Sequence, residues 1–403
     1  MSRSDSKSTA TPGEIARELA KTFRDTAVER DSKGGTPKAE RDAIRKSGLL
    51  SLLVSKEYGG WGESWPAVYE AVTEFASADA SLAHLYGYHY SLFAYLDLFA
   101  SLEQKASWYP KIAREHWFIG NASSENNAHL LDWRVSAKPL PDGSYKINGT
   151  KAFSSGSGDA DRLVSYAVTK DDPIQDGRVI GALIPLDRAG IRVNHDWDSL
   201  GLRQTDSGTV TFSDAVIYPD ELLGAPNQVV DAFAAGSKPS LWTPVTQLIF
   251  AHMYLGITRG ALEEATQYTR TRSRPFTLAG VEKVTEDPYV LEIYGELSAQ
   301  LYVLEAGAKQ AVSRLQELWE LERITAEQRG QLAVEVASVK IAATYLALTY
   351  TSRLYEAMGA RAAANRKFGF DRFWRDARTH TLHDPVAYKI REVGNWALSR
   401  QFP

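Results

Sequence analysis

The sequence of 403 residues contains no cysteine. This absence excludes disulfide bonds, thiolate nucleophiles, iron–sulfur clusters held by protein thiolates and the usual structural zinc sites. It fits a reducing compartment, and we expect a cytoplasmic protein. The first ten residues, MSRSDSKSTA, lack the apolar stretch of a secretory signal, and no apolar run approaches the ~20 residues that would span a bilayer. We therefore expect a soluble protein with no membrane partner.

An excess of charge of one sign is also missing. The chain has 46 basic and 50 acidic residues, a formal net charge of −4, and no long run of either sign separates them. Binding to nucleic acid needs a basic footprint, so we expect no nucleic-acid partner. Aromatic residues make up 11% of the chain. That share suits a site that excludes water around a flat ligand, and it suits ordinary core packing equally well.

The order of patterns along the chain predicts three domains. Helical periodicity begins at a capping box formed by Thr11 and Glu14, gives way to β-branched runs with turn sequences, and returns after Pro226. The predicted helices include 65–77, 80–99, 102–114, 245–271, 289–321 and 325–358. We predict the α+β class, with an N-terminal helical domain (1–115), a middle antiparallel β domain (116–226) and a C-terminal helical bundle (227–403).

Common nucleotide and metal motifs are missing. No G-x-G-x-x-G opens a helix, no Walker loop is present, and H-E-x-x-H does not occur. His380 and His383 are three residues apart, but no third ligand is in view and we expect no metal. Polar clusters do flank predicted strands, at NASSENNAHLLDW from Asn121 and NGTKAFSSGSGDAD from Asn148. Their hydroxyl and amide groups suit the polar edge of an isoalloxazine, although turns that satisfy their own backbone would look the same.

Four motifs occur in the order found in the acyl-CoA dehydrogenase family: NGTKAFSSG, GLRQTDSGTVTFSDAVIYPDELLG, RTRSRPF and RDARTH. The sequence resembles that family over essentially the whole chain. Longer matches resemble one branch of it, the flavin monooxygenases that oxidise dibenzothiophene. They include GLLSLLVSKEYGGWGESWP, HLYGYH, GNASSENN, DWDSLGLRQTDSG, QLIFAHMYLG and GFDRFWRDARTHTLHDPVAYKI.

The resemblance implies an enzyme that receives reduced FMN from a separate NAD(P)H-dependent flavin reductase. Molecular oxygen, the co-substrate, would add at flavin C4a, and the distal oxygen would pass to the sulfur of dibenzothiophene, giving the sulfoxide and then the sulfone. The expected substrate is thus an aromatic organosulfur compound, and the expected assembly is a homotetramer. Oxidation of another aromatic such as indole, by the same flavin chemistry, is the nearest alternative.

The resemblance also assigns residues to the flavin. Ser155 and Asn121 would form hydrogen bonds near N5 and the peroxide, and Arg274 and Arg361 would meet the phosphate, Arg274 commonly from a neighbouring subunit. For the arginines the alternative is a solvated or salt-bridged surface. The full set expected around the flavin is Tyr88, Asn121, Ser123, Phe153, Ser154, Ser155, Trp197, Arg274, Arg361 and His383.

His383 is the residue expected to stabilise or protonate the peroxide, because imidazole both donates and accepts hydrogen bonds near neutral pH. Together with Ser155, Asn121 and His84 it makes up the expected catalytic set, and His380 is a weaker candidate that orients its neighbours. A buried structural role is the alternative for each histidine, and core packing is the alternative for the aromatic residues. The residues expected at the substrate are His84, Trp197, Trp242 and Phe250.

The sequence departs from a true dehydrogenase after the RDA motif. Such enzymes often have Tyr-Glu-Gly-Thr there, and the glutamate removes the substrate α-proton, whereas this chain reads His383, Asp384, Pro385, Val386. An aspartate is one methylene shorter, and the proline restricts its backbone. An acyl-CoA dehydrogenase or oxidase with Asp384 as the base is therefore a second class of function, and a non-catalytic interaction protein is a third.

Overall fold

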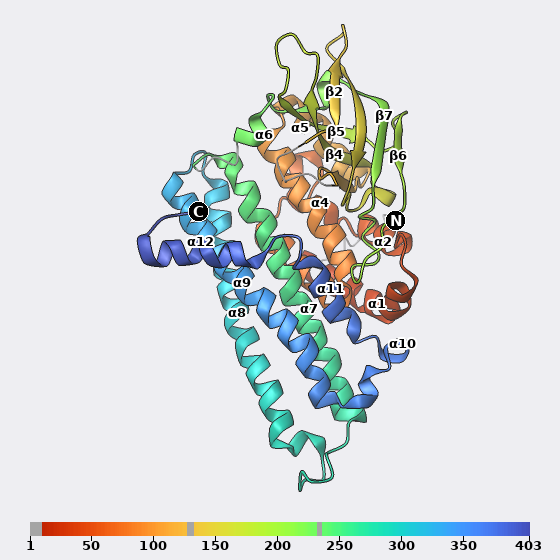
Figure 1. Cartoon of the computed structure of the whole chain (residues 1–403), viewed down its shortest axis with the longest axis vertical. Helices are drawn as coiled ribbons and strands as arrows, with labels where there is room; N and C mark the ends of the chain where they lie inside the picture. The colour runs from red at the N-terminus through yellow and green to blue at the C-terminus, as the bar shows by residue number, and fades with distance from the viewer. Residues whose placement is uncertain (1–9, 127–132, 232–235) are drawn as a thin grey trace, which may run out of the picture.

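The computed structural model of the chain describes residues 10–126, 133–231 and 236–403. Helices, then strands, then helices follow one another along the chain, and the sheet lies at one end of an elongated molecule (Figure 1). The predicted α+β class, with a β layer between two helical units, is confirmed. The first unit consists of α1 (Pro12–Lys33), α2 (Lys38–Ser47), α3 (Trp65–Ala78), α4 (Ala80–Phe99) and α5 (Leu102–Arg114).

Helix α1 begins where its capping box predicts. The side chain of Thr11 accepts from the backbone N–H of Glu14 at 3.3 Å, and the Glu14 carboxylate accepts from the N–H of Thr11 at 2.8 Å. This reciprocal pair satisfies two amides that a helix leaves unpaired. α4 is buried on nearly every side, because it lies against α3, α7 and strand β1. A helix in that position carries apolar residues all round.

The middle strands form one sheet in the order β6-β7-β3-β2-β4-β5-β8, with β1 beside β4. Most neighbours are antiparallel, but β1 and β2 both run parallel to β4. Parallel neighbours need a crossover connection rather than a tight turn, so these two pairings depart from the antiparallel pattern expected of the domain. The strands are β1 (Ile119–Ala122), β2 (Ser136–Pro139), β3 (Tyr145–Lys151), β4 (Arg162–Thr169), β5 (Val179–Pro185), β6 (Ile191–Val193), β7 (Val210–Ile217) and β8 (Leu222–Leu223).

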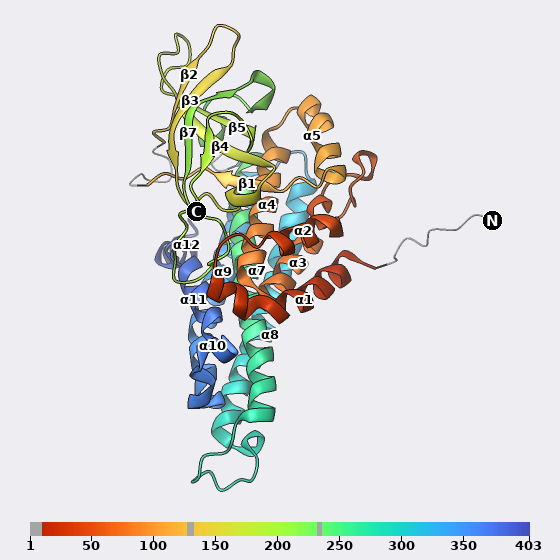
Figure 2. The ribbon, with the colours of Figure 1, turned by 90° about the vertical axis from the view of Figure 1, so that its right-hand side faces the viewer.

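Three long helices make up most of the C-terminal unit. α7, α8 and α9 lie side by side and extend away from the sheet (Figure 2). α7 also packs along α3, so the bundle and the N-terminal helices share one core. The helices of this region are α6 (Gln228–Asp231), α7 (Trp242–Arg272), α8 (Pro288–Glu320), α9 (Ala326–Met358), α10 (Asn365–Phe368), α11 (Asp371–His380) and α12 (Val386–Ser399).

Among the described helices, α9 is the one that is long and apolar enough to cross a membrane, with a mean hydropathy of 1.5 over its most apolar window. Within the protein, 61% of that window is buried. α9 packs against α7, α8 and α12. Its apolar character is therefore that of the central helix of a bundle.

α3 and α7 approach each other closely at two glycines. A Cβ atom at Gly260 would lie 1.9 Å from the carbonyl oxygen of Ser77, and one at Gly256 would lie 2.5 Å from that of Thr73. Real Cβ atoms do not come so near to backbone oxygens, so only glycine permits this crossing. The crossing fixes how far α7 lies from the N-terminal helices.

We predict that Gly260→Ala lowers the free energy of unfolding by about 2–3 kcal/mol, because the added methyl group forces two buried backbones apart. At Gly295 in α8, an added Cβ would have no described atom within 4 Å. As a matched control, Gly295→Ala should raise stability by up to ~1 kcal/mol through helix propensity. Urea unfolding followed by circular dichroism measures both, and equal effects would contradict the packing argument.

Candidate active site

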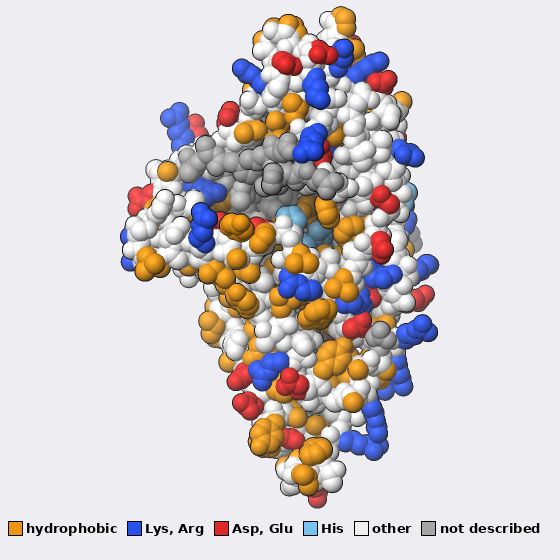
Figure 3. All heavy atoms as spheres, viewed as in Figure 1, with side chains coloured by type: hydrophobic (Ala, Val, Ile, Leu, Met, Phe, Trp, Pro, Cys, Tyr) orange, Lys and Arg blue, Asp and Glu red, His pale blue; other side chains and the backbone are white. Residues whose placement is uncertain are grey.

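Histidine and aromatic side chains from three helices meet below the sheet. His84 and Tyr88 come from one face of α4, Phe250 from α7, His380 from the end of α11 and His383 from the turn that follows it. We call these five residues the histidine cluster. The Phe250 ring centroid lies 4.5 Å from that of His380 and 5.0 Å from that of His383, and His84 lies 5.1 Å from His380. Figure 3 shows histidine atoms in a hollow between the sheet region and the bundle.

Hydrogen bonds hold the cluster in place. The Tyr88 hydroxyl lies 3.2 Å from Nε2 of His383, and the Tyr254 hydroxyl lies 2.8 Å from Nδ1 of His380. The rings of His380 and His383 are parallel to within 6°, with centroids 5.7 Å apart. His84 and His380 are buried, whereas His383 is exposed to the hollow. His383 is therefore the imidazole that a ligand in the hollow can reach.

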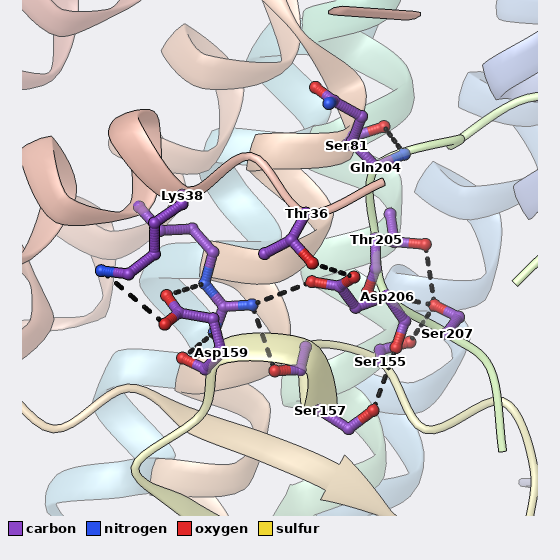
Figure 4. Close-up of polar contacts among 12 residues, drawn as sticks. Thr36, Lys38, Ser81, Ser155, Ser157, Asp159, Gln204, Thr205, Asp206 and Ser207 are labelled. Carbon is purple, nitrogen blue, oxygen red and sulfur yellow. Dashed lines mark hydrogen bonds and ion pairs between the residues drawn. The ribbon is translucent and has the colours of Figure 1, made fainter. Parts of the chain in front are cut away.

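A chain of hydroxyl groups joins the cluster to the β region. Nε2 of His84 lies 2.8 Å from Oγ of Ser155, which lies 2.9 Å from Oγ of Ser207, and this in turn lies 2.8 Å from Oγ1 of Thr205. Figure 4 shows Ser155, Ser207 and Thr205 directed toward one another. The structure thus brings together His84 and Ser155, two members of the predicted catalytic set. Their catalytic roles stay predictions.

The loop that carries Ser155 also presents a flat aromatic face. Phe153 has a φ of 50°, unusual for a residue with a Cβ, and is 56% exposed. Its ring lies 6.3 Å from that of Trp197, whose indole N–H donates to the carbonyl of Leu202 at 2.8 Å. Asn121 donates to the carbonyl of Phe153 at 3.2 Å and accepts from Ser123 at 2.6 Å. Six residues predicted to surround a flavin therefore lie at one site: Asn121, Ser123, Phe153, Ser154, Ser155 and Trp197.

Several buried polar atoms of this site have no hydrogen-bond partner among the described residues. They are Oγ of Ser154, Nδ1 of His84 and Nε2 of His380. Leaving such an atom unpaired costs about 1–3 kcal/mol. A bound ligand or an ordered water that pairs with these atoms removes this cost.

Arg41 of α2 holds the loop that carries Ser155 through hydrogen bonds to its backbone. Its buried guanidinium donates to the carbonyl oxygens of Gly156 at 3.1 Å and Asp159 at 2.7 Å, and lies 3.4 Å from the Asp206 carboxylate. Burial lowers the pKa of Arg41 to about 10, although Asp159 and Asp206 oppose that shift, so it stays charged at neutral pH. Thr36 donates to Asp206 from the segment between α1 and α2 (Figure 4). The loop of residues 153–159, which we call the serine loop, is thus fixed to the N-terminal helices.

Asp384, the carboxylate considered as a dehydrogenase base, is paired with a lysine. Nζ of Lys340 donates to Asp384 at 2.8 Å and also to the side-chain carbonyl of Gln247. Burial alone would raise the pKa of Asp384, but the Lys340 charge and hydrogen bond outweigh it and hold the pKa below its ordinary value. A carboxylate held in this way is a poor proton acceptor. The arrangement argues against removal of a substrate proton by Asp384.

Lys340 and Gln247 were not predicted from the sequence. The available signal was one lysine within the otherwise apolar stretch VASVKIAATYLAL of α9. A charged side chain in such a stretch is either paired or functional. Periodicity alone does not show which helix supplies the partner.

The imidazoles of the site are neutral at pH 7. Burial lowers the pKa of His84 to about 3, with a further contribution from His383, and lowers that of His380 well below its ordinary value. For His383, the depth of the hollow and then the charge of Lys340 lower the pKa, while Asp384 opposes them. The pKa of His383 falls to about 4, which is a smaller shift than that of His84. The cluster therefore combines aromatic faces with uncharged hydrogen-bonding groups.

Arg274 and Arg361 lie elsewhere in the chain. Both are exposed, and they follow the far ends of α7 and α9, where Ser273 donates to the carbonyl of Met358. Arg272, the last residue of α7, is 22 residues beyond Phe250, a helical distance of about 33 Å, and Arg274 follows it. A single chain does not bring these arginines to the histidine cluster.

Trp242, predicted at the substrate, packs against Tyr95 with centroids 5.6 Å apart and donates to the carbonyl of Ser91. It lies about two turns before Phe250 on α7. Within the polar cluster that begins at Asn121, residues 127–132 lie outside the described residues. Assignments to those positions stay predictions.

Comparison with known proteins identifies related sequences over nearly the whole chain. Three models of acyl-CoA dehydrogenase domains match, the N-terminal one over residues 12–116, the middle one over 126–215 and the C-terminal one over 248–387. The chain is 51% identical over 393 residues to the dibenzothiophene monooxygenase of Rhodococcus qingshengii, which covers 97% of this chain and 94% of that protein.

Solved structures agree with the sequence matches. FMN-bound TdsC from Paenibacillus sp. A11-2 superposes with a TM-score of 0.96 at 74% identity, over 97% of this chain and 98% of that one. The complex of TdsC with FMN and indole superposes with a TM-score of 0.94 at 73% identity, over the same shares of the two chains. The resemblance stated from the sequence motifs is confirmed.

The buried histidines predict a fold that weakens in acid. His84, His89 and His252 have pKa values of about 3, 4 and 4, because burial disfavours their charged forms, against an ordinary value of 6.5. Between these lowered pKa values and 6.5, the unfolded chain therefore binds more protons than the folded one. The contribution of these histidines to the free energy of unfolding is complete above pH 6.5 and falls as the pH drops below it. Each histidine contributes about 1.4 kcal/mol per pH unit. Asp376 acts in the opposite direction, because burial raises its pKa to about 8, and it offsets the contribution of one histidine. Urea unfolding between pH 7 and pH 4 measures this, and a flat profile would contradict it.

Proposed function

Because the chain belongs to the acyl-CoA dehydrogenase family, we propose that it is an FMN-dependent monooxygenase of that family, which oxidises the sulfur of dibenzothiophene to the sulfoxide and then the sulfone. One observation carries the proposal. Neutral imidazoles and aromatic rings lie beside a loop of hydroxyl groups, while Asp384, the nearest counterpart of a dehydrogenase base, is paired with Lys340. A related protein with 51% identity is named a dibenzothiophene monooxygenase, and TdsC has been solved with FMN.

The residues present fit FMN. The exposed ring of Phe153 offers a flat surface, and the unpartnered Oγ of Ser154 lies next to Ser155, which provides a second hydroxyl. Asn121 and Ser123 add amide and hydroxyl groups from the end of β1. Reduced FMN, when bound, supplies two electrons and two protons, so that one atom of dioxygen enters the product and the other leaves as water.

The chain contributes binding, orientation and protection from water. In our proposal Phe250, Trp197 and His84 enclose the aromatic substrate and form a substrate slot. Trp242 lies at the outer end of this slot. His383, hydrogen-bonded through Nε2 to Tyr88, holds or donates a proton next to the transferred oxygen. No step requires a strong carboxylate base, in keeping with the ion pair at Asp384.

The position of the two arginines supports an assembly. We propose that Arg274 and Arg361 reach the FMN phosphate from a neighbouring copy, in a homotetramer. The described residues leave a groove of about 860 Å³ between α8 and α9. Figure 3 shows hydrophobic side chains gathered over the bundle. Exposed large apolar residues of that region are Phe276, Leu278, Tyr289, Tyr302, Val303 and Tyr345.

Two further partners follow from the proposal. A separate NAD(P)H-dependent flavin reductase supplies reduced FMN, in the cytoplasm. Indole is a second candidate substrate, because TdsC has been solved with indole. An indole and a thiophene ring system share a flat shape and lack of charge, which are the properties that the histidine cluster accommodates.

Mixing the protein with chemically reduced FMN, oxygenated buffer and dibenzothiophene tests the proposal. We expect dibenzothiophene sulfoxide followed by sulfone, detected by liquid chromatography and mass spectrometry. Free reduced FMN without the protein is the control for non-enzymatic oxidation. Bleaching of bound flavin by an acyl-CoA thioester, with no oxygenated product from either aromatic compound, would contradict the proposal. It would indicate an acyl-CoA dehydrogenase instead.

A further inference from the structure

A buried lysine stands behind the histidine cluster. The Lys340 side chain is 2% exposed and lies in the middle of α9. We propose that Lys340 is a positioning residue of the active site, which holds the turn carrying His383 through Asp384 and whose charge favours the neutral form of that imidazole. Its catalytic consequence rests on the proposed function, whereas its effect on His383 does not.

Contacts from three elements meet at the lysine. Its Nζ donates to Asp384, the residue directly after His383, and to Gln247 on α7. The same Nζ lies 5.8 Å from the centroid of the Phe250 ring, which lies 5.0 Å from the ring of His383. Lys340 therefore ties the turn that carries His383 to both α9 and α7. The other end of His383 is held by Tyr88 of α4.

The charges around His383 come from few groups. Within the described part of the chain, Lys340 and Asp384 are the charged residues that act on its imidazole, and they act in opposite directions. Lys389 and Glu392 of α12 act on the pair itself. The titratable groups packed around His383 from the other elements are uncharged at neutral pH, namely His84 and Tyr88 of α4, Tyr254 of α7 and His380 of α11.

A purely structural role does not require this arrangement. Taking a lysine out of water is costly, and an apolar side chain of similar volume would pack at least as well in a helix bundle. A leucine or methionine would, however, leave Asp384 as the nearest charge to His383. An unopposed carboxylate favours the protonated imidazole. Asp384 alone would favour the protonated form of His383, and the charge of Lys340 outweighs this effect and favours the neutral form.

This charge balance has a consequence for the reaction. A neutral imidazole beside Phe250 keeps the hollow free of net charge, which suits an uncharged aromatic substrate. It also leaves one ring nitrogen as a donor and the other as an acceptor. Protonation of His383 would place a cation against the aromatic slot and remove the acceptor.

The test uses whole protein labelled with ¹³C at Cε1 of histidine, without flavin, and follows each imidazole by NMR as the pH is changed. The His383 signal is identified by its loss in His383→Gln. In the parent protein it should titrate below 6.5, and in Lys340→Arg it should do the same. In Lys340→Met the pKa should rise by about one unit or more, because the cation is lost and Asp384 remains.

Two further variants separate charge from folding. Lys340→Met combined with Asp384→Asn leaves no unpaired buried charge, so it tests the proposal even if the single variant does not fold. It should give a smaller rise, because the effect of Lys340 exceeds that of Asp384. Lys151 is also fully buried and is paired with Glu125 at 2.6 Å. Lys151→Met is the matched control, and it should leave the pKa of His383 unchanged.

The outcomes distinguish the inference from the proposed function. If His383 titrates as in the parent both in Lys340→Met and in its combination with Asp384→Asn, the role of Lys340 is overturned whether or not sulfur is oxidised. If the pKa shifts as expected but no substrate is oxygenated, the charge effect stands and the proposed function fails. When both hold, the acid limb of kcat/KM for sulfur oxidation should move upward by the same amount as the pKa in Lys340→Met and remain in place in Lys340→Arg.

Discussion

Keeping imidazoles uncharged inside the protein is the constraint on which the site depends. His84 and His380 lie in the core, so protonating either would place a cation in a medium that solvates it poorly. Each of these imidazoles keeps one hydrogen bond to a hydroxyl group, from Ser155 for His84 and from Tyr254 for His380. His383 faces the hollow, and the Lys340–Asp384 pair acts on its imidazole in addition to burial. A site of this kind favours flat, uncharged ligands.

The fold is arranged so that two rigid units meet at that point. The helices contribute the imidazoles, and the sheet contributes the loop with Phe153 and Ser155. Arg41 joins the two units, because it reaches from α2 to the carbonyls of that loop. At the opposite side, the Leu202 N–H donates to Asp376 of α11 at 2.6 Å, and a Cβ at Gly201 would meet the backbone of Arg375 at 2.3 Å. The geometry between the imidazoles and the serine loop is thus set by contacts on both sides.

Local signals predicted the helices well. The caps at Thr11 and Thr325 are formed as expected, and the predicted ranges 80–99 and 102–114 coincide with α4 and α5. Sequence motifs placed Ser155 and Trp197 at one site. They did not predict contacts between segments that are far apart in the sequence. Neither Lys340 as partner of Asp384 nor the parallel pairing of β1 and β2 with β4 follows from periodicity, because each depends on which distant segments meet. The distance of Arg274 from the cluster likewise follows from the length of α7 rather than from any motif.

The most direct test of the account compares His383 with a histidine outside the cluster during turnover with reduced FMN. His383→Gln should lower the yield of dibenzothiophene sulfone by roughly 10²-fold, while the reduced flavin consumed appears as hydrogen peroxide. His252 is a suitable control, because it is buried, lies on α7 and packs against Tyr69 rather than within the cluster. His252→Gln should keep the parental ratio of sulfone to peroxide. A parental ratio in His383→Gln would contradict the claim that the histidine cluster is where oxygen is transferred.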